Sequence, residues 1–103
     1  MYKLVVYYHG PEESREWFGL RLRHVWYLNP QLYDERSSMP LWNGDIFAIK
    51  VDPKDYTDET LPLMLMREAR RLVGDGITVN RHGDFVISAD RIEISLEQHV
   101  EEG

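Results

Sequence analysis

Cysteine is absent from this sequence of 103 residues. Disulfide frameworks, thiolate metal sites and cysteine nucleophiles are therefore excluded. Long hydrophobic runs are missing as well, because the first apolar stretch, residues 4–8, ends at His9 and Gly10. Such a stretch is too short for the core of a signal peptide and far too short to span a bilayer. We expect a cytoplasmic protein without a membrane partner.

Positive charge is in short supply. Lys and Arg together number 12, against 18 Asp and Glu, and the net charge is −6. A surface of this sign repels phosphate backbones unless its basic residues cluster, so we expect no direct binding to nucleic acid.

The residue spacings that mark metal and phosphate sites are also lacking. No two histidines stand four residues apart, and the glycines are scattered instead of gathered before a helix. His9 and His82 each precede a glycine, a pattern that turn geometry explains. We therefore predict no cofactor, no metal site and no catalytic residue, and a protein that is not an enzyme. A small enzyme or RNA-processing protein that uses His9, His82 and an arginine is the alternative.

Five segments have the pattern of β-strands. Two are short apolar runs, and three alternate between apolar and polar residues. The predicted strands are Tyr2–Tyr8, Ile46–Val51, Ile77–Arg81, Asp84–Ser88 and Arg91–Leu96. The last three predict an antiparallel meander with turns at residues 82–83 and 89–90 and one apolar face.

One helix is predicted over residues 60–73. Thr60 is a suitable N-cap, and Pro62 is tolerated only in a first turn, which fixes the start. Gly74 supplies a residue that commonly ends helices. The apolar stripe of this helix consists of Leu61, Leu65, Ala69 and Leu72.

Residues 11–28 support two interpretations. At 100° per residue, Phe18, Leu22 and Val25 gather on one side of a helix that would stop at Asn29-Pro30. Alternation at residues 20–23 and the β-favouring residues 25–27 indicate a strand instead. We predict a helix.

Together these elements predict an α+β fold. Two helices pack on a mixed, mainly antiparallel sheet of about five strands, in the order β-α-β-α-β-β-β. We expect a single domain over residues 1–103, with a long loop at 29–44 and a frayed tail at 97–103.

The predicted loop carries bulky apolar residues, namely Tyr33, Leu41 and Trp42, in polar surroundings. Aromatic residues are enriched at the centres of protein interfaces, so we predict that these three contact a protein partner. Folding of Leu41 and Trp42 back onto the core as a lid is the alternative. An acidic run follows, and we predict that it steers the partner electrostatically. The run contains Asp52, Asp55, Asp58 and Glu59.

These features favour a small acidic protein-binding module that docks on a larger protein or nucleoprotein complex. Inhibitors encoded by phages and mobile elements often have this character. We associate this chain with that type of protein by its general features alone. Besides the small enzyme, one more alternative stays open. The chain could be a subunit of a homo-oligomer that buries the face of the meander in a symmetric contact.

Overall fold

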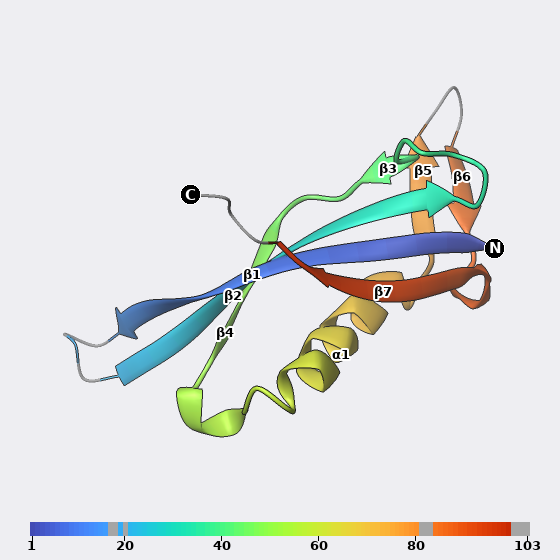
Figure 1. The fold of residues 1–103 in the computed structure, drawn as a ribbon. Helices are drawn as coiled ribbons and strands as arrows, with labels where there is room; N and C mark the ends of the chain where they lie inside the picture. The colour runs from blue at the N-terminus through green and yellow to red at the C-terminus, as the bar shows by residue number, and fades with distance from the viewer. Residues whose placement is uncertain (17–18, 20, 81–83, 100–103) are drawn as a thin grey trace.

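The computed structural model describes residues 1–16, 19, 21–80 and 84–99. Its main sheet has five strands. β1 (Tyr2–Glu16) lies antiparallel to β2 (Arg21–Asp34) on one side and parallel to β7 (Ile92–Gln98) on the other. Two shorter strands, β3 (Trp42–Asn43) and β4 (Phe47–Val51), pair with the outer edge of β2. Figure 1 shows β1 and β2 as a long ribbon that runs the length of the molecule.

A second, two-stranded sheet lies beside the main one. It consists of β5 (Ile77–Asn80) and β6 (Asp84–Ile87), paired antiparallel. β7 does not continue this hairpin but crosses to the main sheet after the short 3-10 helix η2 (Ala89–Arg91). The predicted antiparallel meander is therefore wrong at its third strand. The turn predicted at residues 82–83 lies outside the described residues.

The helix predicted over residues 11–28 is wrong, and so is the predicted order of elements. The described residues of this segment form the second half of β1 and the first half of β2, which pair from Glu12↔Val25 to Glu16↔Arg21. The strand interpretation of residues 20–28 is thus the correct one for the residues described. Hydrogen bonding and cross-strand contacts along this hairpin outweigh a helical pattern that rested on few residues. The described order is β-β-β-β-α-β-β-β, with one α-helix.

Two prolines, Pro11 and Pro30, lie inside the long strands. The register of the hairpin shifts between residues 9 and 12, so Pro11 occupies an irregular position where a missing N–H is tolerated. The carbonyl of Pro30 accepts a hydrogen bond from the Gly44 N–H at 2.9 Å. The backbone of Pro30 therefore points away from β1, and its missing N–H removes no bond to that strand. Consequently β2 continues through the start of the loop predicted at 29–44, and residues 35–41 connect it with β3.

The single described α-helix, α1 (Leu61–Val73), has its predicted start and end. Thr60 precedes it, Pro62 lies in its first turn and Gly74 follows it. The Thr60 hydroxyl accepts from the Thr57 N–H at 2.8 Å instead of capping the helix. The buried side of α1 consists of Leu61, Leu65, Ala69 and Val73, whereas Leu72 is half-buried.

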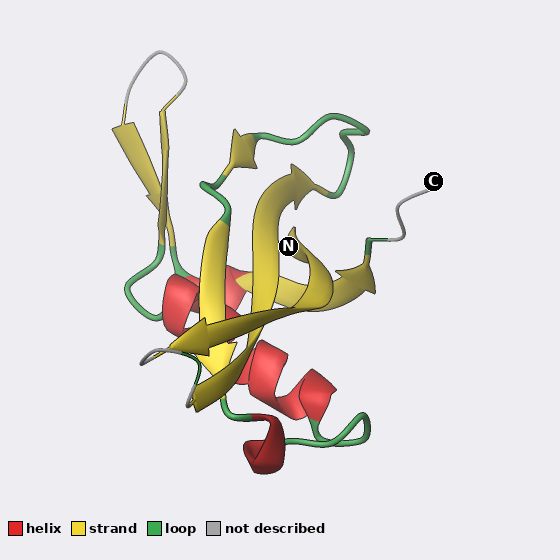
Figure 2. Ribbon diagram, turned by 90° about the vertical axis from the view of Figure 1, so that its left-hand side faces the viewer, coloured by secondary structure: helices red, strands yellow, loops and turns green. Residues whose placement is uncertain are grey.

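α1 and the β5–β6 hairpin cover the same face of the main sheet (Figures 1 and 2). One hydrophobic core joins the main sheet, α1 and the β5–β6 hairpin. The sheet contributes Leu4, Val6, Leu28 and Leu32, α1 contributes Leu65 and Ala69, and the hairpin contributes Ile77, Val79 and Ile87. No helix or strand of the described chain packs on the opposite face of the main sheet. Among the described residues, the side chains on this opposite face are half-buried on most of β1 and β2 and exposed on β7.

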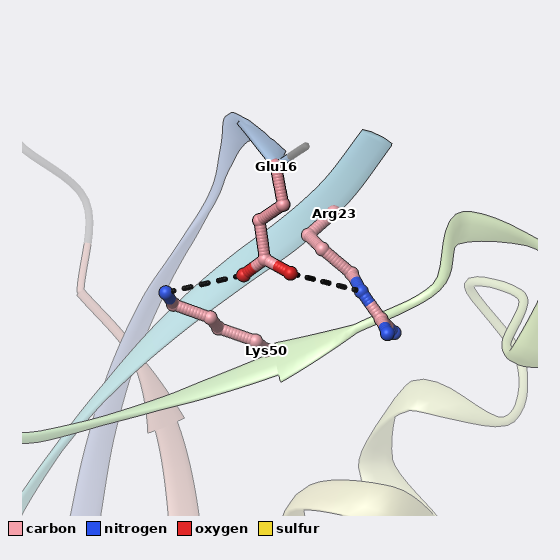
Figure 3. Close-up of polar contacts among 3 residues, drawn as sticks. All are labelled: Glu16, Arg23 and Lys50. Carbon is pink, nitrogen blue, oxygen red and sulfur yellow. Dashed lines mark hydrogen bonds and ion pairs between the residues drawn. The ribbon is translucent and has the colours of Figure 1, made fainter. Parts of the chain in front are cut away.

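The end of the β1–β2 ribbon that lies far from the β5–β6 hairpin contacts β4. The carboxylate of Glu16 lies 3.4 Å from Lys50 Nζ and 3.9 Å from Arg23 Nε (Figure 3). After η1 (Pro53–Asp55), the Tyr56 hydroxyl accepts from Trp26 Nε1 at 3.2 Å and lies 2.6 Å from His24 Nδ1. The Glu16 contacts tie the end of β1 to β2 and β4, and the Tyr56 contacts hold β2 against the segment after β4. Surface ion pairs contribute only about 0–1 kcal/mol each.

Candidate functional site: the open face of the sheet

The face of the main sheet that points away from α1 is the candidate site, and we call it the open face. Side chains alternate between the two faces of a strand. The core residues Leu4, Val6, Leu28 and Leu32 point toward α1, so the residues next to them in sequence point to the open face. The register places them in cross-strand pairs, and β7 continues the rows beside β1. The open face consists of Lys3, Val5, Tyr7, His9, Tyr27, Asn29, Gln31, Tyr33, Glu93, Ser95 and Glu97.

Two tyrosines near the centre of the open face, Tyr7 and Tyr33, interact through their hydroxyl groups. The Tyr33 hydroxyl donates to Gln31 Oε1 at 2.7 Å. Hydrogen bonding to Tyr33, partial burial and the charge of Glu97 raise the pKa of Tyr7 to about 12. The raised pKa means that Tyr7 keeps its proton, and its ability to donate a hydrogen bond, to higher pH than an ordinary tyrosine.

An aromatic platform lies at the other end of the open face. The His9 ring stacks on Tyr27 with the centroids 5.0 Å apart and the planes inclined by 17°. The His99 ring contacts His9 edge-on at a centroid distance of 6.1 Å. The Tyr27 hydroxyl donates to the Glu12 carboxylate at 2.9 Å, and this bond raises the pKa of Tyr27. The platform thus combines flat rings with a carboxylate at its border.

Two hollows interrupt the open face, and Tyr7 borders both. The first, of about 440 Å³, lies between Tyr7, the His9–Tyr27 pair and Ile46. The second, of about 580 Å³, lies between Tyr7, Tyr33, Lys3 and the loop after β2. Both hollows are lined by aromatic rings, with amides in the first and carboxylates in the second, and hollows of this size can receive side chains of a partner.

The charges of the open face are mainly negative. Glu93 and Glu97 are exposed on β7, and Glu12 borders the platform, whereas Lys3 supplies positive charge next to Glu93. This distribution matches a partner with basic groups and repels the phosphate backbone of a nucleic acid.

The structure separates the three residues predicted to anchor a partner. Tyr33 belongs to the open face. Trp42 pairs with the buried Leu32 and packs against the core on the side of α1, as the lid alternative describes. Leu41 is half-buried and its N–H donates to the Leu32 carbonyl at 2.7 Å. Tyr33 and Trp42 therefore do not form one surface.

The acidic run lies elsewhere again. Asp52 precedes η1, where its carboxylate accepts from the Lys54 N–H at 2.9 Å, while Asp55, Asp58 and Glu59 are exposed before α1. Figure 1 places η1 and β3 at opposite ends of the path through β4. The acidic run and Trp42 therefore lie at the two ends of β4, and the run is not part of the open face.

Two histidines had suggested a catalytic alternative. His9 lies within β1 on the open face, and His82 lies outside the described residues. Over residues 1–16, 19, 21–80 and 84–99, no three His, Asp or Glu side chains are grouped as a metal would require.

Sequence reasoning missed most of the open face. Tyr7 was assigned to a short apolar strand, Tyr27 to a helix, and Asn29 and Gln31 to a loop. The available signal was alternation across residues 25–33, where Trp26, Leu28, Pro30 and Leu32 occupy every second position. Pro30 obscures that pattern, because proline is uncommon inside strands.

Comparison with known proteins gives no relative from which a function could be transferred. No family model, no curated protein and no solved structure matches this chain. In the part of the chain that the structure describes, no helix is long and apolar enough to cross a bilayer. The function must therefore be argued from the open face itself.

Proposed function

We propose that this protein is a protein-binding module that docks on a basic surface of a larger partner through its open face. The observation that carries the proposal is one-sided coverage of the main sheet. α1 and the β5–β6 hairpin bury one face, while the other displays Tyr7, Tyr27 and Tyr33. Tyrosine provides a large contact area together with a polar group, and it is among the residues enriched in interface hot spots.

Charge complementarity supports a basic partner. The net charge of −6 and the carboxylates of Glu93, Glu97 and Glu12 create a negative field around the tyrosines. Such a field raises the association rate with a cationic surface and lowers it with an anionic one. Tyr7 and Tyr27 would then provide most of the affinity, and the carboxylates most of the steering.

The test is affinity capture from cells that naturally contain this protein, with the parent and with two variants compared side by side. Tyr27→Ala removes the platform from the open face. Phe85→Ala is the matched control, because Phe85 is an exposed aromatic residue on β6 in the second sheet. Proteins retained by the parent and by Phe85→Ala but lost with Tyr27→Ala are the expected partners.

Affinity measured with the purified partner gives the second readout. We expect Tyr27→Ala to weaken binding about thirtyfold, the loss that corresponds to roughly 2 kcal/mol at an interface hot spot. Phe85→Ala should change it less than threefold. Equal effects of the two variants, or no effect of Tyr27→Ala and Tyr7→Ala in folded protein, would show that the open face is not the docking surface.

A further inference from the structure

β7 forms one border of the main sheet, and within the described chain no strand pairs with its outer edge. The exposure of the β7 side chains also indicates that this edge is uncovered. Ile94 and Leu96 point to the core side but remain half-buried, whereas their neighbours on β1, Leu4 and Val6, are 0% exposed. The core side of β7 is therefore incompletely covered at this border.

The backbone of β7 offers hydrogen bonds at that edge. The His99 N–H donates to the Tyr8 carbonyl at 2.7 Å, which shows that the backbone of His99 points toward β1. Backbone groups alternate sides along an extended strand, so those of residues 93, 95 and 97 also point toward β1. The N–H and C=O groups of residues 92, 94, 96 and 98 consequently point outward. They form a ready template for one more strand.

The side chains of β7 select against a second copy of this chain. A two-fold antiparallel pair that uses the whole of β7 is centred on Ser95. It places Glu93 of each copy opposite Glu97 of the other, so two pairs of like charges face each other. Like charges directly opposite each other destabilise a strand pair, and acidic residues on an edge are a common means of preventing such pairing.

The same side chains match a basic strand. A segment paired with β7 would place two of its residues, four positions apart, opposite Glu93 and Glu97. Lys or Arg at these positions would form cross-strand ion pairs. Apolar residues at the two intervening positions on the other side would cover the half-buried Ile94 and Leu96. The matching pattern is cation, apolar, any residue, apolar, cation.

We propose that the outer edge of β7 binds an extended segment of the partner with basic residues four positions apart, which adds a strand to the main sheet. The inference rests on the proposed function, because it names the part of a protein partner that this chain recognises. The added strand would continue the open face beyond Glu93 and Glu97, so both surfaces can act in one complex.

The direct test is a peptide titration followed by the backbone amide signals of the full chain in NMR spectra. The probe is acetyl-Ser-Lys-Val-Thr-Val-Lys-Ser-amide, and the control peptide carries Glu at both Lys positions. We expect saturable shifts of the Ile94 and Leu96 amides with the Lys peptide and at least tenfold weaker binding of the Glu peptide at low salt. No shifts on β7, or equal binding of the two peptides, would overturn the inference.

A charge substitution tests the edge without a peptide. Glu97→Lys places a lysine opposite Glu93 of the second copy, twice, and turns the repulsive self-pairing into an attractive one. We expect this variant to form a dimer in analytical ultracentrifugation, and Glu93→Lys/Glu97→Lys to be monomeric again. Glu59→Lys is the matched control, because it changes the net charge from −6 to −4 as Glu97→Lys does, at an exposed site away from β7. A folded Glu97→Lys that stays monomeric contradicts an available edge.

The two proposals can fail separately. If Tyr27→Ala loses the partner while the Lys peptide leaves β7 unaffected, the open face is the docking surface and the strand addition is wrong. If the Lys peptide binds β7 while Tyr27→Ala and Tyr7→Ala retain the partner, the edge is a binding site and docking through the open face is wrong.

Discussion

Tyr7 is the residue whose surroundings most clearly alter its chemistry. Its pKa is raised to about 12 by Tyr33, by partial burial and by Glu97, whereas a tyrosine in the unfolded chain ionises near 10. The folded state thus retains the proton to higher pH. The resulting stabilisation is fully present below pH 10 and is lost as the pH rises through 12.

Tyr7→Phe tests this linkage. We expect the free energy of unfolding of the parent to fall more steeply between pH 10 and pH 12 than that of Tyr7→Phe, as measured by urea denaturation. Tyr33→Phe should lower the pKa of Tyr7, because it removes the main cause of the shift. Parallel pH profiles for the parent and Tyr7→Phe would show that folding does not raise the pKa of Tyr7.

Gly10 illustrates why the sequence suggested a turn at a site that is part of a strand. Its φ is +144°, and a side chain there would place Cβ only 2.9 Å from the Val25 carbonyl oxygen. A His-Gly-Pro sequence is typical of a chain reversal, but the same freedom of glycine also serves a β-bulge. Which of the two forms depends on β2, whose approach cannot be deduced from residues 9–11 alone.

At the scale of elements, α1 was predictable because its signals are local. Thr60, Pro62 and Gly74 lie within the helix or next to it, and the apolar spacing repeats over three turns. Residues 11–28 had local signals for both helix and strand. The segment pairs partly with itself, between residues 12–16 and 21–25, and partly with β4 and the first half of β1. Local patterns do not contain the information about these pairings.

α1 also provides a prediction at this scale. Leu65 is 0% exposed and Leu63, two residues away on the same helix, is 71% exposed. Leu65→Ala should lower the free energy of unfolding by about 2–5 kcal/mol, because it leaves a cavity in the core. Leu63→Ala should change it by less than about 0.5 kcal/mol, since exposed sites are usually tolerant. Urea denaturation of both variants is the measurement, and similar losses would mean that the buried side of α1 is assigned incorrectly.

At the scale of the whole molecule, the sequence predicted an α+β composition but not which face is covered. Five strands and one α-helix of the structure overlap predicted elements at least in part, while β7 joins β1 across most of the chain length. That parallel pairing, together with the crossing of α1 and the hairpin to one side, creates the open face. Tyr33 was identified as a candidate from its residue type, and its neighbours Tyr7 and Tyr27 become apparent only when β1 and β2 are paired.

Net charge is a property of the whole molecule, and it predicts how stability responds to salt. The chain carries −6, and the described ion pairs are few and none is buried, so repulsion among carboxylates exceeds the attraction within pairs. Salt screens both, and the larger repulsion is reduced more. We expect the melting temperature to rise by about 4 °C between 10 mM and 200 mM NaCl, the shift that roughly 0.5–1 kcal/mol produces in a domain of this size.

A variant with fewer carboxylates distinguishes the screening of charge repulsion from other effects of salt on stability. Glu13→Gln/Asp45→Asn/Asp75→Asn removes three exposed carboxylates that form no ion pair with the described residues and changes the net charge from −6 to −3. It should melt higher than the parent at 10 mM NaCl and show about half of the parent's rise at 200 mM, because less repulsion remains to be screened. Differential scanning calorimetry at the two salt concentrations measures both effects. If the melting temperature of the parent falls with salt, the ion pairs around Glu16 outweigh the net repulsion, and the negative field inferred around the open face is weaker than its charges suggest.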